Sequence, residues 1–251
     1  MTDRARRSGD VPKGAFFPNR PRPLILGHRG APLAAPENSL AAFEAALRGG
    51  ADGVECDARL TAELAVVIHH DETLDRTAEG TGPVRSKTLR ELRALRLRGG
   101  AGGERIPLLA EVLDLCRGRG GALVEAKVEL PGEAEPLADA ILREIDRAGG
   151  KGEVGVISFS HAVVARVAAK APELPYGPIF DAAFAPAAAL GSRPSLVVLE
   201  RSLLVSGVVT PLLSAGAEVF SYSLDTEEDR RLARSVGVLG WISNLPDRRG
   251  V

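Results

Sequence analysis

Residues able to handle phosphate esters stand at the ends of several short apolar runs in this sequence. Carboxylates bind hard divalent cations, imidazoles exchange protons near neutral pH, and Arg and Lys hold phosphoryl oxygens. No single pair is diagnostic, but their order and placement together predict a metal-assisted phosphoester site. The candidate residues are His28, Arg29, Glu55, Asp57, His70, Glu125 and Lys127.

The acidic candidates could share one metal ion. Side chains alternate across a strand, so Glu55 and Asp57 share one face while Cys56 points to the other. Glu125 ends a different expected strand and could supply a third oxygen ligand to a hard divalent ion. The alternative is that these acids are solvated or paired with Arg or Lys. Their occurrence together with two histidines favours the metal site.

Two of the four histidines are placed for acid–base catalysis. His28 ends the first expected strand and His70 ends the returning arm of a hairpin, so both can reach the same rim. His69 faces the other side of its strand, and His161 lies at an expected helix start. Each of the first two could instead be a structural histidine, but the neighbouring acids favour catalysis.

Arg29 and Lys127 are the candidate substrate-binding cations. Arg29 offers a planar fork to two phosphoryl oxygens, and Lys127 lies two residues after Glu125 on the same strand face. Both could instead pair with the acids in a structural network, and both roles can hold when no ligand is bound. Glu37 is expected to stand behind the site and to orient Arg29 or His28.

The composition indicates a globular enzyme without a bias towards charged partners. The apolar fraction is 45% and the charged fraction 26%, which excludes disordered and fibrous classes. Lys and Arg number 32 against 33 Asp and Glu, so no global field attracts nucleic acid or an anionic membrane. Any phosphate must be held by local groups. Stable membrane insertion is not expected, and the oligomeric state stays open.

The first 23 residues are rich in arginine and contain no sustained apolar stretch. They resemble neither a secretory signal nor a membrane anchor and are expected to form a mobile tail. With only Cys56 and Cys116, the chain has no disulfide framework and no thiolate zinc cluster. A cytoplasmic location is therefore expected.

From residue 24 onward, short apolar runs alternate with segments of helical periodicity, which predicts parallel βα units. The chain length suits a single catalytic (β/α)8 TIM-type barrel over residues 24–251. The expected strands are 24–28, 53–57, 66–70, 122–127, 153–158, 176–180, 196–199, 218–222 and 239–243. The expected helices are 40–48, 89–95, 108–117, 136–148, 182–190 and 227–236, the first of them capped by Asn38 or Ser39.

Nine runs exceed the eight strands of such a barrel by one. Residues 58–65 are too few for a crossover between parallel strands, so the second and third runs should form an antiparallel hairpin. A turn centred on Ala62-Glu63 sets Glu55 opposite His70, although this dipeptide is a poor turn former and leaves a slip of one residue open. Residues 73–106 are expected to form an excursion above the rim, where barrel loops build active sites.

Several motifs occur together, mostly in the N-terminal half. They are His28-Arg29-Gly30, Pro36-Glu37-Asn38, Glu55-x-Asp57, residues 66–77, Gly80-Thr81-Gly82, residues 88–92, Ile106-Pro107-Leu108 and Glu125-x-Lys127. In combination they resemble the glycerophosphodiester phosphodiesterase family. The C-terminal half resembles it only through the βα pattern.

The resemblance implies a barrel enzyme that cleaves a small glycerophosphodiester to glycerol 3-phosphate and an alcohol, with one divalent cation, Mg²⁺ or Ca²⁺. One histidine would activate the glycerol 2-hydroxyl, which attacks phosphorus to give a cyclic phosphate, while the other protonates the leaving alcohol. Water would then open the ring. The implied metal ligands are Glu55, Asp57 and Glu125, the implied acid/base pair is His28 and His70, and Arg29 and Lys127 would lie near the phosphate.

Some positions depart from the family pattern. Tyr222-Ser223-Leu224-Asp225 stands where a Trp-Thr-Val-Asn-like run is usual, and Asn244 stands where an Asp usually precedes the final x-Pro. Ala78 replaces a common Thr, and Glu63-Leu64 replaces an Asp-Gly turn. None of these changes removes an expected ligand or acid/base group. They bear on the substrate pocket and on the hairpin.

Two other functions are compatible with the same residues. A barrel with this chemistry could cleave lysophospholipids or other lipid phosphodiesters, which would favour an exposed apolar surface on residues 73–106. The basic residues of that segment favour soluble substrates instead. A non-catalytic barrel that binds a phosphorylated metabolite is the other alternative, and the intact set of candidate residues argues against it.

Overall fold

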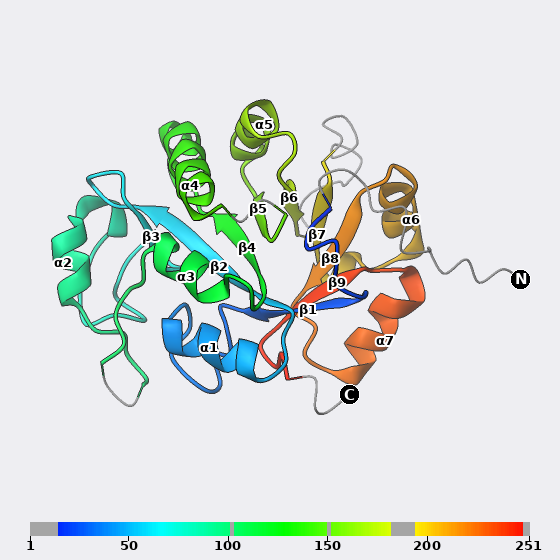
Figure 1. Cartoon of the computed structure of the whole chain (residues 1–251), viewed down its shortest axis with the longest axis horizontal. Helices are drawn as coiled ribbons and strands as arrows, with labels where there is room; N and C mark the ends of the chain where they lie inside the picture. Colours follow the sequence, from blue (N-terminus) through cyan, green and yellow to red (C-terminus); the bar gives the residue numbers. More distant parts are fainter. Residues whose placement is uncertain (1–14, 101–102, 150–151, 182–193, 248–251) are drawn as a thin grey trace, which may run out of the picture.

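Eight parallel strands close into a barrel in the computed structural model (Figure 1). The structure describes residues 15–100, 103–149, 152–181 and 194–247. β1 pairs with both β9 and β2, which closes the ring and confirms the predicted (β/α)8 barrel. The strands, including β3 as an antiparallel neighbour of β2, are β1 Leu24–His28, β2 Gly53–Leu60, β3 Val66–Ile68, β4 Gly121–Ala126, β5 Val154–Ser158, β6 Tyr176–Phe180, β7 Leu196–Glu200, β8 Glu218–Tyr222 and β9 Gly240–Ser243.

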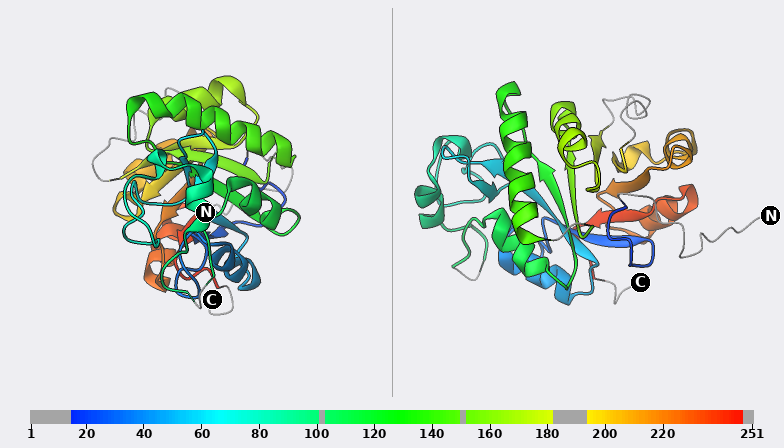
Figure 2. Two further views of the ribbon diagram at one scale, coloured as in Figure 1. Left: turned by 90° about the vertical axis from the view of Figure 1, so that its left-hand side faces the viewer. Right: turned by 45° about the horizontal axis from the view of Figure 1, so that its top comes forward.

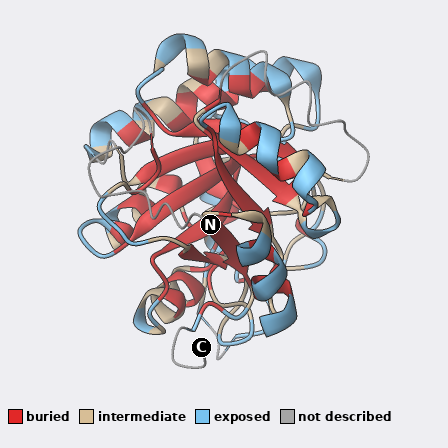
Figure 3. Cartoon of the chain, turned by 90° about the vertical axis from the view of Figure 1, so that its right-hand side faces the viewer, coloured by how far each residue is buried: buried red, intermediate tan, exposed pale blue. Residues whose placement is uncertain are grey.

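Helices lie around the outside of the barrel and cover its apolar outer face (Figure 2). Figure 3 shows the strands buried and the helices exposed on their outer sides. None of the described helices has both the length and the apolar character needed to cross a membrane. The predicted helix over residues 182–190 lies outside the described residues. The helices are α1 Leu40–Arg48, α2 Leu89–Ala94, α3 Leu109–Cys116, α4 Ala134–Ala148, α5 His161–Lys170, α6 Ser206–Ser214 and α7 Glu227–Val236.

The hairpin of β2 and β3 forms with a register that differs by one residue from the prediction. Ala58 pairs with Ile68, so the numbers of paired residues sum to 126 rather than 125. The connection is longer than a two-residue turn because Thr61 Oγ1 accepts hydrogen bonds from the backbone N–H groups of Glu63 and Ala65. The predicted turn centred on residues 62–63 is therefore wrong.

The position of His70 changes with this register. β3 ends at Ile68, and the backbone N–H of His69 donates to the carbonyl of Asp57 at 2.8 Å. The prediction had placed Glu55 opposite His70 across the hairpin. In the observed register they are not partners.

The described part of residues 73–106 forms a lobe beside β3 with a small core of its own. Its helix α2 starts with a capping box, in which Thr88 and Glu91 satisfy each other's backbone N–H groups. Val67 of β3 belongs to the same core and bridges to Leu108. The lobe core consists of Val67, Leu74, Ala78, Val84, Leu92, Leu97 and Ile106.

Residues 15–23 close the N-terminal end of the barrel. Phe16 is fully buried among the inward-facing barrel side chains. Its backbone N–H donates to the Glu218 carboxylate at 2.8 Å, and Arg22 pairs with the same carboxylate at 2.5 Å. The expected mobile tail is wrong for this segment, because it buries apolar area and satisfies a buried acid. Residues 1–14 lie outside the described residues.

We expect Phe16→Ala to lower the free energy of unfolding by about 3–5 kcal/mol, because the truncation leaves a cavity at the closed end of the barrel. Denaturant-induced unfolding measures the change. Leu33→Ala is the control, since Leu33 is 77% exposed and its loss should change stability by no more than about 0.5 kcal/mol. Equal losses in the two variants would contradict the packing role of Phe16.

Candidate active site

The C-terminal ends of the barrel strands surround a cavity of about 170 Å³. Parallel strands end at the same rim, so groups far apart in the sequence meet there. The two halves of the cavity differ in chemistry, with charged and imidazole groups from the first strands and apolar groups from β5 onward. The first half contains His28, Arg29, Glu55, His70, Glu125 and Lys127, and the second contains Ile157, Phe159, Ile179, Val198, Tyr222 and Ile242.

Glu55, Asp57 and Glu125 form a buried acid cluster, in which one oxygen of each lies within 4.8 Å of the others. The sheet register places Asp57 directly beside Glu125 on the neighbouring strand. Oxygens bound to one Ca²⁺ ion can lie up to about 5 Å apart, so this spacing suits a shared ion. Glu125 Oε1 is buried without a well-directed hydrogen bond, although Lys127 Nζ lies 2.7 Å away. The acid cluster therefore fits a hard divalent cation.

Burial and neighbouring charges shift the pKa values of these acids in opposite directions. Burial, assisted by the charges of Asp57 and Glu125, raises the pKa of Glu55 well above its ordinary value. Burial also raises the pKa of Glu125 to about 7, against the attraction of Lys127. Burial acts in the same sense on Asp57, but Lys127 and Arg29 outweigh it and bring its pKa to about 2. Asp57 thus stays charged at neutral pH, while the other two acids bind protons more readily.

Arg29 and Lys127 both contact the acid cluster. The backbone N–H of Arg29 donates to Glu55 at 3.0 Å, and its Nε lies 3.4 Å from Asp57. Lys127 Nζ lies 3.2 Å from Asp57 and 2.7 Å from Glu125. The pairing considered as an alternative for these cations is thus present, and both side chains also line the cavity.

His70 is held through both its backbone and its ring. Arg59 Nε and Nη2 donate to the His70 carbonyl at 3.0 and 2.5 Å. The imidazole Nδ1 lies 2.7 Å from Asp71 Oδ1. These contacts hold the imidazole of His70 at the cavity, just beyond the end of β3.

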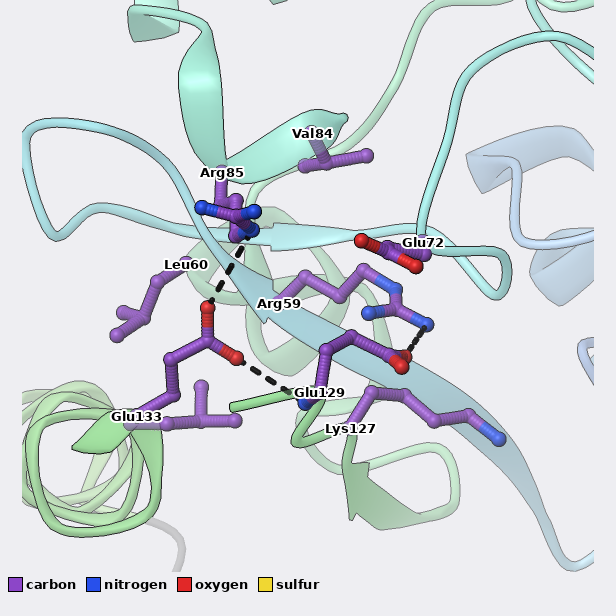
Figure 4. Close-up of a pocket in the computed structure, with 9 residues that line it drawn as sticks. Arg59, Leu60, Glu72, Val84, Arg85, Lys127, Glu129 and Glu133 are labelled. Atoms are coloured by element: carbon purple, nitrogen blue, oxygen red, sulfur yellow. Dashed lines mark hydrogen bonds and ion pairs between the residues drawn. The ribbon is translucent and has the colours of Figure 1, made fainter. Parts of the chain in front are cut away.

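Arg59 also anchors the loop that carries Lys127 (Figure 4). Its Nη2 donates to Glu129 at 2.8 Å, and Glu133 accepts from the backbone N–H of Glu129 at 3.1 Å. Glu133 lies 3.8 Å from Arg85 of the lobe. In Figure 4 the Lys127 side chain extends away from these pairs, which leaves its ammonium group to meet the acid cluster.

Arg76 pairs with one acid that contacts His70 and with another that contacts Arg29. Its Nε and Nη2 donate to both oxygens of Asp71 at 2.6 and 2.9 Å. Its Nη1 and Nη2 donate to the two oxygens of Glu37, each at 2.8 Å. Glu37 in turn accepts from Arg29 Nη1 at 2.9 Å, which is the contact that an orienting role requires.

His28 contacts a polar pair at the ends of two neighbouring strands. Its Nδ1 lies 2.8 Å from Asn244 Oδ1, and Asn244 Nδ2 donates to Asp225 Oδ2 at 2.8 Å. Burial and the adjacent Arg29 lower the pKa of His28, while the bond to Asn244 opposes them. Burial likewise lowers the pKa of His70. Unprotonated imidazoles are thus favoured at neutral pH.

The other two histidines do not line the cavity. The ring nitrogens of His69 lie 2.9 Å from the Asp71 carbonyl and 2.9 Å from Thr77 Oγ1. His161 begins α5, and its ring lies 6.3 Å from that of Phe180. These observations agree with the predictions that His69 faces away from the site and that His161 begins a helix.

Asn38 is a site residue that its helix-capping pattern concealed. Ser39 is the cap, because its Oγ accepts from the backbone N–H of Ala42 at 3.0 Å. Asn38 instead donates to the Asp57 carboxylate at 2.7 Å and so fixes its orientation. Arg59 was also overlooked, although strand alternation puts it on the face of Asp57. Asp71, Arg76 and Asp225 lay within segments compared with the family, but no role at the site was predicted for any of them.

Comparison with known proteins assigns the chain to a family. The profile of the Glycerophosphoryl diester phosphodiesterase family matches residues 28–248. The chain belongs to this family. A glycerophosphodiester phosphodiesterase from Caldanaerobacter subterraneus is 30% identical over 231 residues, which cover 89% of this chain and 95% of that protein. A probable glycerophosphodiester phosphodiesterase 1 from Mycobacterium tuberculosis is 35% identical over 88% of each chain. The crystal structure of a glycerophosphodiester phosphodiesterase from Agrobacterium tumefaciens is 28% identical, has a TM-score of 0.76, and matches over 89% of this chain and 97% of that one.

For this member of the glycerophosphoryl diester phosphodiesterase family, we expect Mg²⁺ or Ca²⁺ to stabilise the fold more at about pH 8 than at about pH 5. The folded-state pKa values of Glu55 and Glu125 are raised, so their protonated forms favour folding. The metal-free protein loses that stability as the pH rises above 4.5 and through the raised pKa values of the two acids, about 7 for Glu125. A bound cation replaces the protons and offsets the loss. Thermal unfolding with and without the cation measures the difference.

The control for this prediction is the double variant Glu55→Gln/Glu125→Gln. It lacks both titrating groups, so any cation effect should be small and should not change over the same pH range. If the cation stabilised the unaltered protein equally at both pH values, that result would contradict a shared ion at the acid cluster.

Proposed function

We propose that the chain is a metal-dependent phosphodiesterase that hydrolyses glycerophosphodiesters to glycerol 3-phosphate and an alcohol. The family match and the activity named for its relatives support this reaction. The observation that carries the proposal is a cluster of three buried carboxylates, two of which line the same cavity as two imidazoles. Burying three acids together is costly and does nothing for the packing of a barrel, so a catalytic use explains them better than a structural one.

The proposed reaction proceeds in two steps through a cyclic phosphate. Arg29 and Lys127 hold the phosphoryl oxygens. One histidine of the pair His28 and His70 takes the proton of the glycerol 2-hydroxyl, whose oxygen attacks phosphorus. The other gives a proton to the departing alcohol oxygen as its bond to phosphorus breaks. In the second step a water molecule attacks phosphorus, the bond to the glycerol 2-oxygen breaks, and the histidines exchange roles.

The proposed metal ligands are Glu55, Asp57 and Glu125. A cation bound there, Mg²⁺ or Ca²⁺, supplies positive charge that offsets the charge building on the phosphoryl oxygens. Asn38 keeps the Asp57 carboxylate oriented towards the cluster. Lys127 contacts two of the three acids and therefore links the metal site to the phosphate site.

Small soluble substrates are the preferred class. A lipid substrate would favour exposed apolar side chains on the lobe, yet in the described part of residues 73–106 no large apolar residue is exposed. The apolar half of the cavity offers a surface for the carbon atoms of glycerol or of the leaving alcohol. Lysophospholipids are thus the second substrate class to assay.

We expect purified protein to release glycerol 3-phosphate from glycerophosphocholine or glycerophosphoethanolamine in the presence of Mg²⁺ or Ca²⁺. A chelator should abolish release and excess cation should restore it. An analogue without the 2-hydroxyl should not be cleaved, because no cyclic phosphate can form. Binding of substrate and cation without product, for soluble and lipid substrates alike, would instead support the non-catalytic barrel.

His28→Ala and His70→Ala should each lower kcat by at least roughly 10²-fold, the scale of a lost general acid or base. His161→Ala is the matched control, because its exposed ring does not line the cavity, and it should keep nearly full activity. A variant at position 28 or 70 with undiminished kcat would remove that histidine from the mechanism.

Arg76→Ala should lower kcat about 10-fold to 100-fold, the scale seen when a supporting contact behind a reacting group is lost. The guanidinium contacts Asp71 beside His70 and Glu37 beside Arg29, and Arg76 is not among the residues that line the cavity. Arg90→Ala, an exposed change on α2, is the control and should leave kcat unaltered. Equal activities of the two variants would argue against a positioning role for Arg76.

A further inference from the structure

We infer that Asp225 is a positioning residue that fixes the tautomer of His28 through the side-chain amide of Asn244. This inference rests on the proposed function, in which His28 exchanges a proton with the substrate. It concerns the side-chain hydrogen bonds that run from Asp225 through Asn244 to His28.

The strand order brings these three residues together. Gly27 of β1 pairs with Ser243 of β9, so the residues that follow them, His28 and Asn244, come side by side. β8 is the other neighbour of β9, and Asp225 follows β8 by three residues. The ends of neighbouring barrel strands thus bring Asp225 next to Asn244, and Asn244 next to His28.

Both oxygens of Asp225 accept hydrogen bonds from this strand end. Oδ1 accepts from Ser243 Oγ at 2.8 Å and from the backbone N–H of Asn244 at 2.7 Å. Oδ2 accepts from Asn244 Nδ2 at 2.8 Å. A carboxylate can only accept, so the amide must turn its NH2 group towards Asp225.

The orientation of the amide then determines which nitrogen of His28 carries hydrogen. Asn244 Oδ1 lies 2.8 Å from His28 Nδ1, and an amide oxygen can only accept. Nδ1 must therefore be the protonated nitrogen. In the neutral ring the lone pair is then on Nε2, which is the form that can take a proton from a substrate hydroxyl.

The charged groups around His28 do not select a tautomer in this way. Arg29 on the same strand end, Asp57 on β2 and His70 after β3 act on the ring through their charges. Among the described residues, Asn244 is the hydrogen-bond partner of the His28 ring. The amide, and the carboxylate that orients it, thus decide the tautomer.

Asp225→Asn should reverse the direction of the hydrogen bonds between residues 225, 244 and 28 without breaking them. The oxygen of the new amide at position 225 would stay with the backbone N–H of Asn244, so its NH2 group would face Nδ2 of Asn244, and two donors would meet. Turning the Asn244 amide over relieves this conflict but points its NH2 at His28 Nδ1. The ring must then accept at Nδ1 and carry hydrogen on Nε2, which removes the proton acceptor from the cavity.

The double exchange Asp225→Asn/Asn244→Asp should restore the original tautomer. The NH2 of residue 225 would donate to the new carboxylate at position 244, whose second oxygen accepts from His28 Nδ1. One carboxylate and one amide are again present, in reversed order. If Asp225 were needed only for the fold, this exchange would not restore activity, because it removes the carboxylate from position 225.

The test combines nitrogen-15 NMR of the imidazoles at alkaline pH with steady-state kinetics on glycerophosphocholine and Mg²⁺. The chain has four histidines, so the His28 signals are assigned by comparison with His28→Ala. We expect the Nδ1–H tautomer in the unaltered protein, the Nε2–H tautomer in Asp225→Asn, and the Nδ1–H tautomer in the double variant. We expect kcat to fall about 10²-fold in Asp225→Asn with little change in KM, and to recover at least about tenfold in the double variant.

Asp114→Asn on α3 is the matched control, since this acid is exposed and pairs with Arg117 on the same surface. It should leave both the tautomer and kcat unchanged. An Nε2–H tautomer in the unaltered protein, or an unchanged tautomer in Asp225→Asn, would overturn the inference even if that variant folds poorly enough to lose activity. If the unaltered protein cleaves no substrate, the proposed function fails, whereas the NMR result still decides the role of Asp225.

Discussion

Crowded negative charge at one side of the barrel mouth is the constraint on which the rest of this structure depends. Three carboxylates lie buried within 4.8 Å of one another, where their mutual repulsion is poorly screened by water. Arg29 and Lys127 neutralise part of that charge, and protons or a cation must neutralise the remainder. The placement of the two cations, the unusual pKa values and the fit to a hard ion all follow from this requirement.

The two imidazoles of the site are held by different means. His70 lies after the end of a strand, and charged groups fix it: Arg59 at its carbonyl and Asp71 at its ring. His28 ends a barrel strand, and a neutral amide contacts its ring. The first arrangement depends on ion pairs that reach the surface through Arg76, whereas the second depends on the register of the barrel strands.

The sequence predicted what depends on local patterns. Apolar runs identified the nine strands found in the described residues, and alternation within a strand correctly placed Glu55 and Asp57 on one face. The hairpin register differs from the predicted one by the single residue that the poor turn dipeptide had left open, because Thr61 Oγ1 stabilises a longer connection. The closure of the barrel by Phe16 was missed because an arginine-rich segment gave no indication of its buried partner Glu218. Arg76 and Asp225 act across long stretches of sequence, and only the fold brings their partners within reach.

The lobe formed by residues 73–106 has a consequence for how the molecule behaves in concentrated solution. A hairpin appended to a closed barrel leaves one side of its outer strand with unpaired backbone groups, which can recruit a strand from another molecule. Here Val67 bridges to Leu108, and the N–H of Ile68 donates to the carbonyl of Pro107 at 2.8 Å, so the chain returning from the lobe occupies that side. Pro107 and Leu108 therefore shield the outer edge of β3 from pairing with a strand of another molecule.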